Sequence, residues 1–194
     1  MTKPSVILTV GHSTRTLEEF IGLLKVHAIS LVADVRTIPR SRHNPQFNKG
    51  SLENSLKAAS IGYVHLPKLG GLRHAKTDSP NTGWRNASFR GFADHMQTPE
   101  FEQGLKELIR KAGKSRTALM CAEAVPWRCH RSLIADALLA RGIRVEHIIS
   151  PTSCYVHDLT SFAKQQGTTI TYPAEPPRKR KKTQSRHARA AVCI

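Results

Sequence analysis

The segment Val6-Ile-Leu-Thr-Val-Gly-His-Ser-Thr14 contains a short apolar run followed directly by a turn of small and polar residues. A run of this length and composition is typical of a buried strand. Thr16 and Glu19 follow with the spacing of a capping box, which predicts a helix that continues to about residue 26. This segment of strand, turn and helix is the start of an alternation of strand and helix patterns that continues along the chain.

Later apolar runs repeat the strand pattern, and segments with helical spacing lie between them. Further strands are expected at residues 29–35, 63–66, 117–121 and 145–149. Helices are expected near residues 52–59, from residue 98 onward, at 126–140 and, with a weak pattern, at 159–164, whereas residues 67–98 show no clean period. The alternation predicts an α/β fold, a single-domain, Rossmann-like layered sandwich with a mostly parallel sheet of about five strands and helices on both faces.

Length and charge indicate one domain with a basic extension. The chain has 194 residues, 30 Lys and Arg against 14 Asp and Glu, and a net charge of +16. Hydrophobic residues make up 39 %, which excludes a wholly disordered chain. Between residues 174 and 194 there are seven basic residues and one acidic residue, without apolar periodicity. We therefore expect an α/β domain at 1–172 and a basic, disordered tail at 173–194.

Compartment and membrane association follow from what the sequence lacks. No apolar run approaches the roughly 18 residues that span a bilayer, and the N-terminus has no secretory signal pattern. The cysteines, at positions 121, 129, 154 and 193, do not form a disulfide framework. We expect a cytoplasmic protein with no membrane partner, while its cofactors and oligomeric state stay open.

Polar and charged residues follow the predicted strands. The carboxyl ends of parallel strands meet at one edge of a sheet, where ligands bind if the strand order reverses. The strand ends and the loops behind them supply His12, Ser13, Asp34, Arg36, Arg40, Arg73, Cys121 and Glu123. Residues of these types together indicate a pocket at that edge, although solvated loop ends are the alternative.

The segment Cys121-Ala-Glu-Ala-Val-Pro-Trp-Arg-Cys-His-Arg131 combines a strand end, a loop and a predicted helix start at Pro126. A helix N-terminus attracts anions, and in its first turn Cys129 would have a lowered pKa beside Arg and His. A thiolate nucleophile at Cys121 or Cys129 is one interpretation, and a small buried structural cysteine is the alternative for Cys121. Six residues separate Cys121 from Arg128, so the loop differs from the Cys-x5-Arg cradle of thiolate phosphatases and sulfur transferases.

Two other classes of function fit parts of the sequence. Cys121, Cys129 and His130, with His12 or Glu123, could form a tetrahedral metal site or a thiol redox module, although no CxxC or HxxxH pair is present. Nucleic-acid binding without catalysis would use the basic face, DNA or RNA contacts of the tail at 178–189, and base stacking. The loop aromatics offered for stacking are Phe47, Trp84, Phe89 and Phe92.

Several separated motifs occur in order along the chain. They are Val10-Gly-His-Ser-Thr14, Asp34-Val-Arg36, Pro39-Arg-Ser41, Phe47-Asn48, Tyr63-Val-His-Leu66, Leu69-Gly-Gly71 with Arg73, and Cys121-Ala-Glu123 with Cys129-His-Arg131. Over residues 6–150 this pattern resembles the bacterial family known as domain of unknown function 488. The resemblance implies an α/β fold and no particular activity. It marks as signature positions His12, Ser13, Asp34, Arg36, Pro39, Ser41, Cys121, Glu123, Cys129, His130 and Arg131. Ala124-Val125 departs from the family, which often has Lys-Asp there.

The leading hypothesis is a small enzyme that acts on an anionic substrate, such as a nucleotide, a nucleic acid or another phosphate-bearing molecule. In it, arginines hold the anion, a cysteine is the nucleophile or redox group, Glu123 and His12 exchange protons, and Asp34 orients a basic group. The catalytic candidates are Cys121, Glu123, Cys129, His130, His12 and Asp34, and the substrate-binding candidates are Ser13, Arg36, Arg40, Ser41, Arg73 and Arg131. For Glu123 the alternative is a structural carboxylate, bonded to backbone N–H groups or paired with Arg36 or Arg131.

Overall fold

The structure is a computed structural model that describes residue 4 and residues 6–174. The expected tail contacts at 178–189 lie outside the described residues, as do Cys193 and most of the predicted tail. Within the described part, no helix has both the length and the apolar character needed to cross a bilayer.

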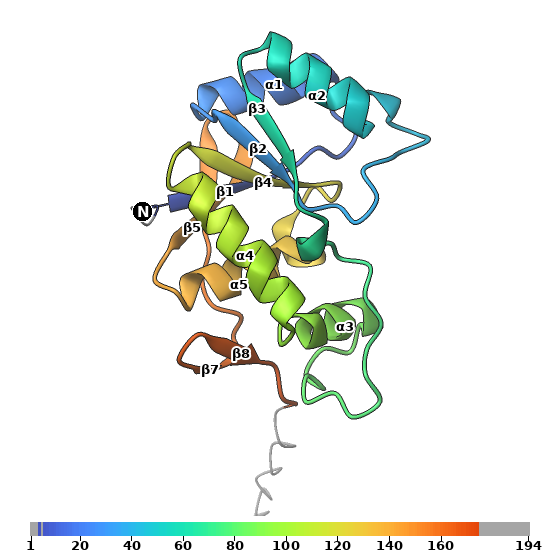
Figure 1. Cartoon of the computed structure of the whole chain (residues 1–194), viewed down its shortest axis with the longest axis vertical. Coiled ribbons are helices and arrows are strands. Elements are labelled where there is room, and N and C mark those ends of the chain that lie inside the picture. The colour runs from blue at the N-terminus through green and yellow to red at the C-terminus, as the bar shows by residue number, and fades with distance from the viewer. Residues whose placement is uncertain (1–3, 5, 175–194) are drawn as a thin grey trace, which may run out of the picture.

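A six-stranded sheet forms the centre of the domain, in the order β3-β2-β4-β1-β5-β6 (Figure 1). Its strands are β1 (Val6–Gly11), β2 (Leu31–Asp34), β3 (Gly62–His65), β4 (Thr117–Cys121), β5 (Arg144–Ser150) and β6 (Ser153–Val156). The first five strands are parallel, and β6 pairs antiparallel with β5. The predicted α/β architecture with a mostly parallel sheet is therefore confirmed, and β6 adds an edge strand to it.

Helices cover both faces of the sheet, because the side chains of buried strands alternate between two apolar cores. Leu8 of β1 packs in one core, with α1 (Leu17–Val26) and α2 (Lys49–Ala58). Ile7 packs in the other, with α3 (Ala87–His95), α4 (Pro99–Ala112) and α5 (Arg131–Leu139). Short 3-10 turns occur at η1 (Pro45–Phe47), η2 (Pro67–Leu69) and η3 (Pro126–Arg128).

The helix predicted at 126–140 is wrong at its start. Pro126–Arg128 form the 3-10 turn η3, and Cys129 is extended, with φ −135° and ψ 143°. The regular helix α5 therefore begins only at Arg131, so Cys129 precedes the helix instead of lying in its first turn. A proline fixes the start of either kind of helix, and the sequence pattern does not distinguish them.

Two other segments differ from the predicted elements. The weak helix at 159–164 is absent, because Thr160 turns inward and bonds through its N–H and hydroxyl to Asp136. The chain continues into a hairpin of β7 (Lys164–Gln166) and β8 (Thr169–Thr171). In contrast, α3 lies inside the aperiodic stretch 67–98, where Asn86 caps it through the N–H groups of Ser88 and Phe89.

The topology places a crevice between β1 and β4. These strands are neighbours, yet the chain leaves them in opposite directions: from β1 through α1 to β2, and from β4 through α5 to β5. Ligands bind in α/β sheets at such a switch point, outside the carboxyl ends of the strands. Gly11 ends β1 here, and a Cβ added to it would lie 1.8 Å from the carbonyl oxygen of Glu123.

We expect Gly11→Ala to lower the free energy of unfolding by about 1–3 kcal/mol, because the methyl group collides with backbone that cannot move aside cheaply. The control is Gly22→Ala on α1, where an added Cβ has no neighbour within 4 Å. This control should raise stability by about 0.5–1 kcal/mol, since alanine favours a helix. Urea denaturation of both variants measures the difference, and equal stability of the two would contradict the close approach at Gly11.

Candidate functional site

A cavity of about 740 Å³ lies at the carboxyl ends of β1, β2 and β4. This volume accommodates a small-molecule ligand. Nine predicted site residues line it, namely His12, Ser13, Arg36, Arg40, Ser41, Cys121, Glu123, Cys129 and His130. Three others lie elsewhere: Asp34 and Arg131 are buried beside it, and Arg73 points away. Residues from four separate segments thus meet at one cavity, as expected for the carboxyl edge of a parallel sheet.

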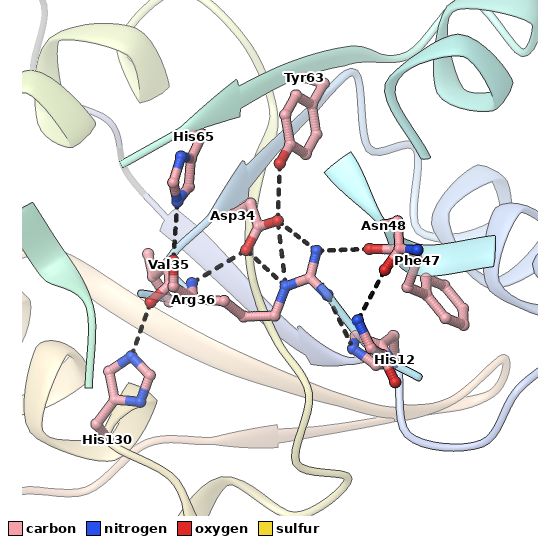
Figure 2. Close-up of polar contacts among 10 residues, drawn as sticks. His12, Asp34, Val35, Arg36, Phe47, Asn48, Tyr63, His65 and His130 are labelled. Atoms are coloured by element: carbon pink, nitrogen blue, oxygen red, sulfur yellow. Dashed lines mark hydrogen bonds and ion pairs between the residues drawn. The ribbon is translucent and has the colours of Figure 1, made fainter. Parts of the chain in front are cut away.

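A buried ion pair between Asp34 and Arg36 forms one wall (Figure 2). The Nη2 and Nε atoms of Arg36 donate to the Asp34 carboxylate at 2.6 and 2.9 Å. Nη2 also donates to the carbonyl of Phe47 at 2.8 Å, and the hydroxyl of Tyr63 donates to Asp34 at 2.8 Å. Asp34 thereby neutralises Arg36 inside the protein, so Arg36 shapes the wall more than it attracts an anion.

His12 completes this wall in its neutral form. Its Nδ1 donates to the carbonyl of Ser13 at 2.9 Å, and its Nε2 accepts from Arg36 at 3.3 Å. The ring stacks on Phe47 with centroids 4.2 Å apart. Burial lowers the pKa of His12 to about 4, so the ring is uncharged at neutral pH. With both nitrogens engaged, His12 holds the guanidinium of Arg36 in place and is poorly placed to exchange protons with a ligand.

Two sulfurs and an imidazole meet in the lining of the same cavity. The Nδ1 atom of His130 lies 4.0 Å from the Sγ of Cys121 and 3.8 Å from the Sγ of Cys129. The Nε2 of His130 bonds to the carbonyl of Val35 at 3.1 Å, as Figure 2 shows. Both cysteines are buried, at 8 % and 3 % exposure, and both line the cavity.

The two cysteines differ in acidity. A hydrogen bond from Cys121, with the positive charge of Arg131 nearby, lowers the pKa of Cys129 well below its usual range despite burial. The same bond to Cys129, together with burial, raises the pKa of Cys121 well above its usual range. The shared hydrogen bond therefore favours the proton on Cys121 and the negative charge on Cys129. A low pKa for Cys129 was expected from a position at a helix N-terminus. In the structure, the side chains next to its sulfur lower the pKa instead.

Arg131 contacts both the loop after β4 and the sulfur of Cys129. Its guanidinium is 1 % exposed and donates to the carbonyls of Glu123 and Ala124 at 2.6 and 3.4 Å. Its Nε also donates to the Sγ of Cys129 at 3.4 Å. These bonds position the loop after β4 and the sulfur, so the arginine faces protein atoms and not the cavity. Arg73 is likewise engaged, with the carbonyl of Gly70 and the carboxylate of Glu100.

Arg40 and Arg128 supply the accessible positive charge. Both are exposed and line the cavity, and neither has an ion pair or side-chain hydrogen bond to another residue of 6–174. Glu123 is exposed in the same lining, and its carboxylate pairs with neither Arg36 nor Arg131. Arg128 was not among the predicted site residues, although its position one residue before Cys129 was a signal for it.

The loop aromatics do not form an exposed stacking surface. Phe47 and Phe92 are fully buried in the two cores. Trp84 is half-buried and packs against Phe89 and Phe162, with ring centroids 4.7 and 4.9 Å apart. Of the four aromatics expected to stack on bases, Phe89 alone lines the cavity among the described residues.

Residues 16–138, more than half of the chain, match the family model described as Domain of unknown function DUF488. The matched segment contains the Asp34–Arg36 pair and the cluster of Cys121, Cys129 and His130, and it begins after His12. The resemblance inferred from the motifs is confirmed. No curated protein and no solved structure matches the chain.

We expect Asp34→Asn to lower the free energy of unfolding by about 3–5 kcal/mol, because it leaves the buried guanidinium of Arg36 without a counter-charge. Tyr63→Phe removes a single hydrogen bond to the same carboxylate and should cost about 1–3 kcal/mol. Guanidinium chloride denaturation measures both values. A loss for Asp34→Asn no larger than that for Tyr63→Phe would show that the ion pair does not hold this wall.

Proposed function

The chain belongs to the family described as domain of unknown function DUF488, and from this premise we propose that it is an enzyme acting on a phosphate-bearing small molecule. The family description names no activity, so the proposal rests on the residues of the cavity. The observation that carries it is the convergence of the Cys129 sulfur with two unpaired arginines, Arg40 and Arg128, on one cavity.

The two arginines account for the charge of the substrate. Arg40 follows β2 and Arg128 lies in the loop between β4 and α5, so they approach the cavity from different segments. Exposed guanidinium groups without protein carboxylates are free to form bidentate bonds with phosphate oxygens. Because Arg36 and Arg131 already bond to protein atoms, we assign anion binding to Arg40 and Arg128.

The thiol and imidazole cluster is the proposed reactive centre. The lowered pKa of Cys129 favours its ionised, nucleophilic form, and hydrogen bonds from Cys121 and Arg131 stabilise a negative charge on its sulfur. Glu123 lines the same cavity with an exposed carboxylate, which suits it to accept or return a proton. Ser13 and Ser41 add hydroxyl groups to the lining, where they can bond to the polar part of a substrate.

The proposal assigns positioning roles to the buried charges. His12, Arg36 and Asp34 form a fixed wall, so the cavity keeps its shape when it is empty. A site with preorganised walls loses little conformational entropy when a ligand binds. Nucleic-acid binding by the segment 178–189 stays a prediction, because that segment lies outside the described residues.

Arg40→Gln and Arg128→Gln should each weaken the binding of a phosphate-bearing probe about tenfold or more, since each removes a charge-assisted bond. Isothermal titration with ATP and with inorganic pyrophosphate measures this. The matched control is Arg110→Gln, an exposed residue of α4 outside the cavity, which should leave the affinity unchanged. Equal weakening by all three variants would indicate attraction by overall charge and would contradict a specific anion site.

Alkylation by iodoacetamide should show a different pH profile for each thiol of metal-free, EDTA-treated protein. Since a lowered pKa keeps Cys129 ionised, its rate should change little from pH 9 to pH 7. Partial burial of the sulfur and the nearby carboxylate of Glu146 raise the pKa of Cys154. The alkylation rate of Cys154 should therefore fall about tenfold for each pH unit from pH 9 to pH 7. Peptide mapping by mass spectrometry follows both sites in one sample, and parallel profiles would rule out a thiolate at Cys129.

A further inference from the structure

The side chains of Cys121, Cys129 and His130 present three metal-binding atoms to one point. Both Sγ atoms and the Nδ1 of His130 all lie within 4.8 Å of one another. They come from the end of β4 and from the residues just before α5, which the sheet and Arg131 hold in place. The cluster is therefore formed by rigid elements and does not depend on a flexible loop closing around an ion.

The tautomer of His130 leaves the correct nitrogen free. A carbonyl oxygen can only accept a hydrogen bond, so the Nε2 of His130 carries the hydrogen that bonds to Val35. In the neutral ring Nδ1 then has a free lone pair, and it is this atom that faces both sulfurs. A backbone carbonyl on the outer nitrogen is the usual way in which proteins orient a histidine that binds a metal.

The spacing of the three atoms fits a tetrahedral ion. Zinc bonds of about 2.3 Å to sulfur and about 2.0 Å to nitrogen place neighbouring ligand atoms roughly 3.5–3.8 Å apart. The two nitrogen–sulfur distances here are 3.8 and 4.0 Å, so small side-chain movements bring the atoms to an ion. Zinc binding would displace the proton of Cys121, and the resulting two thiolates with one imidazole form a soft donor set that selects zinc over magnesium or calcium.

The cavity borders these atoms. Gly71 packs closely against the imidazole, and a Cβ added to it would lie 2.5 Å from the Nδ1 of His130. All three residues, and Gly71, line the cavity that also holds Arg40 and Arg128. With three protein ligands, the fourth position of a tetrahedral ion would face this cavity. Catalytic zinc sites have this arrangement, whereas structural sites use four protein ligands.

We propose that Cys121, Cys129 and His130 bind one zinc ion, with its fourth position open to the cavity for water or a substrate oxygen. The inference rests on the proposed function for the identity of that substrate, a phosphate-bearing molecule held by Arg40 and Arg128. Arg131 then acts as a positioning residue, because its Nε–H bonds to the Cys129 sulfur from the side away from the cavity lining.

Cobalt titration of the full chain tests the site. The protein used in this test carries the substitutions Cys154→Ser and Cys193→Ser, so that Cys121 and Cys129 are its remaining thiols. After reduction and EDTA treatment it should bind one Co²⁺ per chain, with the intense visible bands of a tetrahedral ion and a thiolate-to-cobalt charge-transfer band. Zn²⁺ should displace the cobalt, and bound Zn²⁺ should protect both thiols from iodoacetamide. Absence of these bands, or a stoichiometry near zero, overturns the proposal.

Variants separate the ligands from their surroundings. Cys121→Ser, Cys129→Ser and His130→Ala should each weaken cobalt binding at least about tenfold and change the charge-transfer band. His43→Ala, an exposed residue outside the cavity lining, is the control and should bind like the parent. Gly71→Ala keeps all three ligands and should still weaken cobalt binding, because the added methyl group crowds His130. This variant tests the site even if a ligand variant fails to fold. Unchanged binding in folded Cys129→Ser overturns the proposal.

The two proposals fail in different experiments. If cobalt does not bind while Arg40→Gln and Arg128→Gln still weaken ATP binding, the metal site is wrong and the anion site stands. If cobalt binds at these ligands but neither arginine variant changes the affinity for ATP or pyrophosphate, the metal site stands and the proposed substrate class is wrong.

Discussion

The ion pair between Asp34 and Arg36 is the interaction on which the arrangement of the cavity depends. Charges buried this deeply are stable only when each is paired and fully hydrogen-bonded. The pair meets that condition by engaging Tyr63 of β3, the carbonyl of Phe47 in η1 and His12 after β1. Three segments of the chain are thereby fixed relative to the end of β2, and each of them borders the cavity or supports its wall.

The second constraint is the switch point between β1 and β4. Because the two strands are adjacent and their following helices leave in opposite directions, the loop after β4 must cross the end of β1. Gly11 makes that crossing possible, and Arg131 holds the loop by its carbonyls from beneath. Cys121 and Cys129, which flank this loop, are then held facing His130. The cluster of Cys121, Cys129 and His130 thus results from the same topology that forms the crevice.

Much of the fold could be predicted from the sequence, and so could nine of the residues that line the cavity. The apolar runs and the capping box at Thr16 define parallel strands and a helix locally, and strand ends converge by topology alone. The direction of a long side chain is not local information. Arg131 ends the segment 121–131 that the sequence singled out. Its guanidinium nevertheless enters the interior, because it donates hydrogen bonds there to the hydroxyl of Thr9 and to two backbone carbonyls. The late start of α5 likewise depends on the extended backbone at Cys129, and α3 was hidden by its short length and Gly91.

The arginines in and around the cavity divide into a buried pair and an exposed pair. Arg36 and Arg131 are bound to a carboxylate, carbonyls and a sulfur, so their charge is used within the fold. Arg40 and Arg128 lie at the cavity with free guanidinium groups. An anion that neutralised them would lie in the same cavity as the thiol and imidazole cluster, whose own negative charge favours a cation. Under the two proposals, Arg40 and Arg128 hold the anion and the two cysteines hold the metal ion. The shared cavity would then bring a phosphate oxygen to that ion.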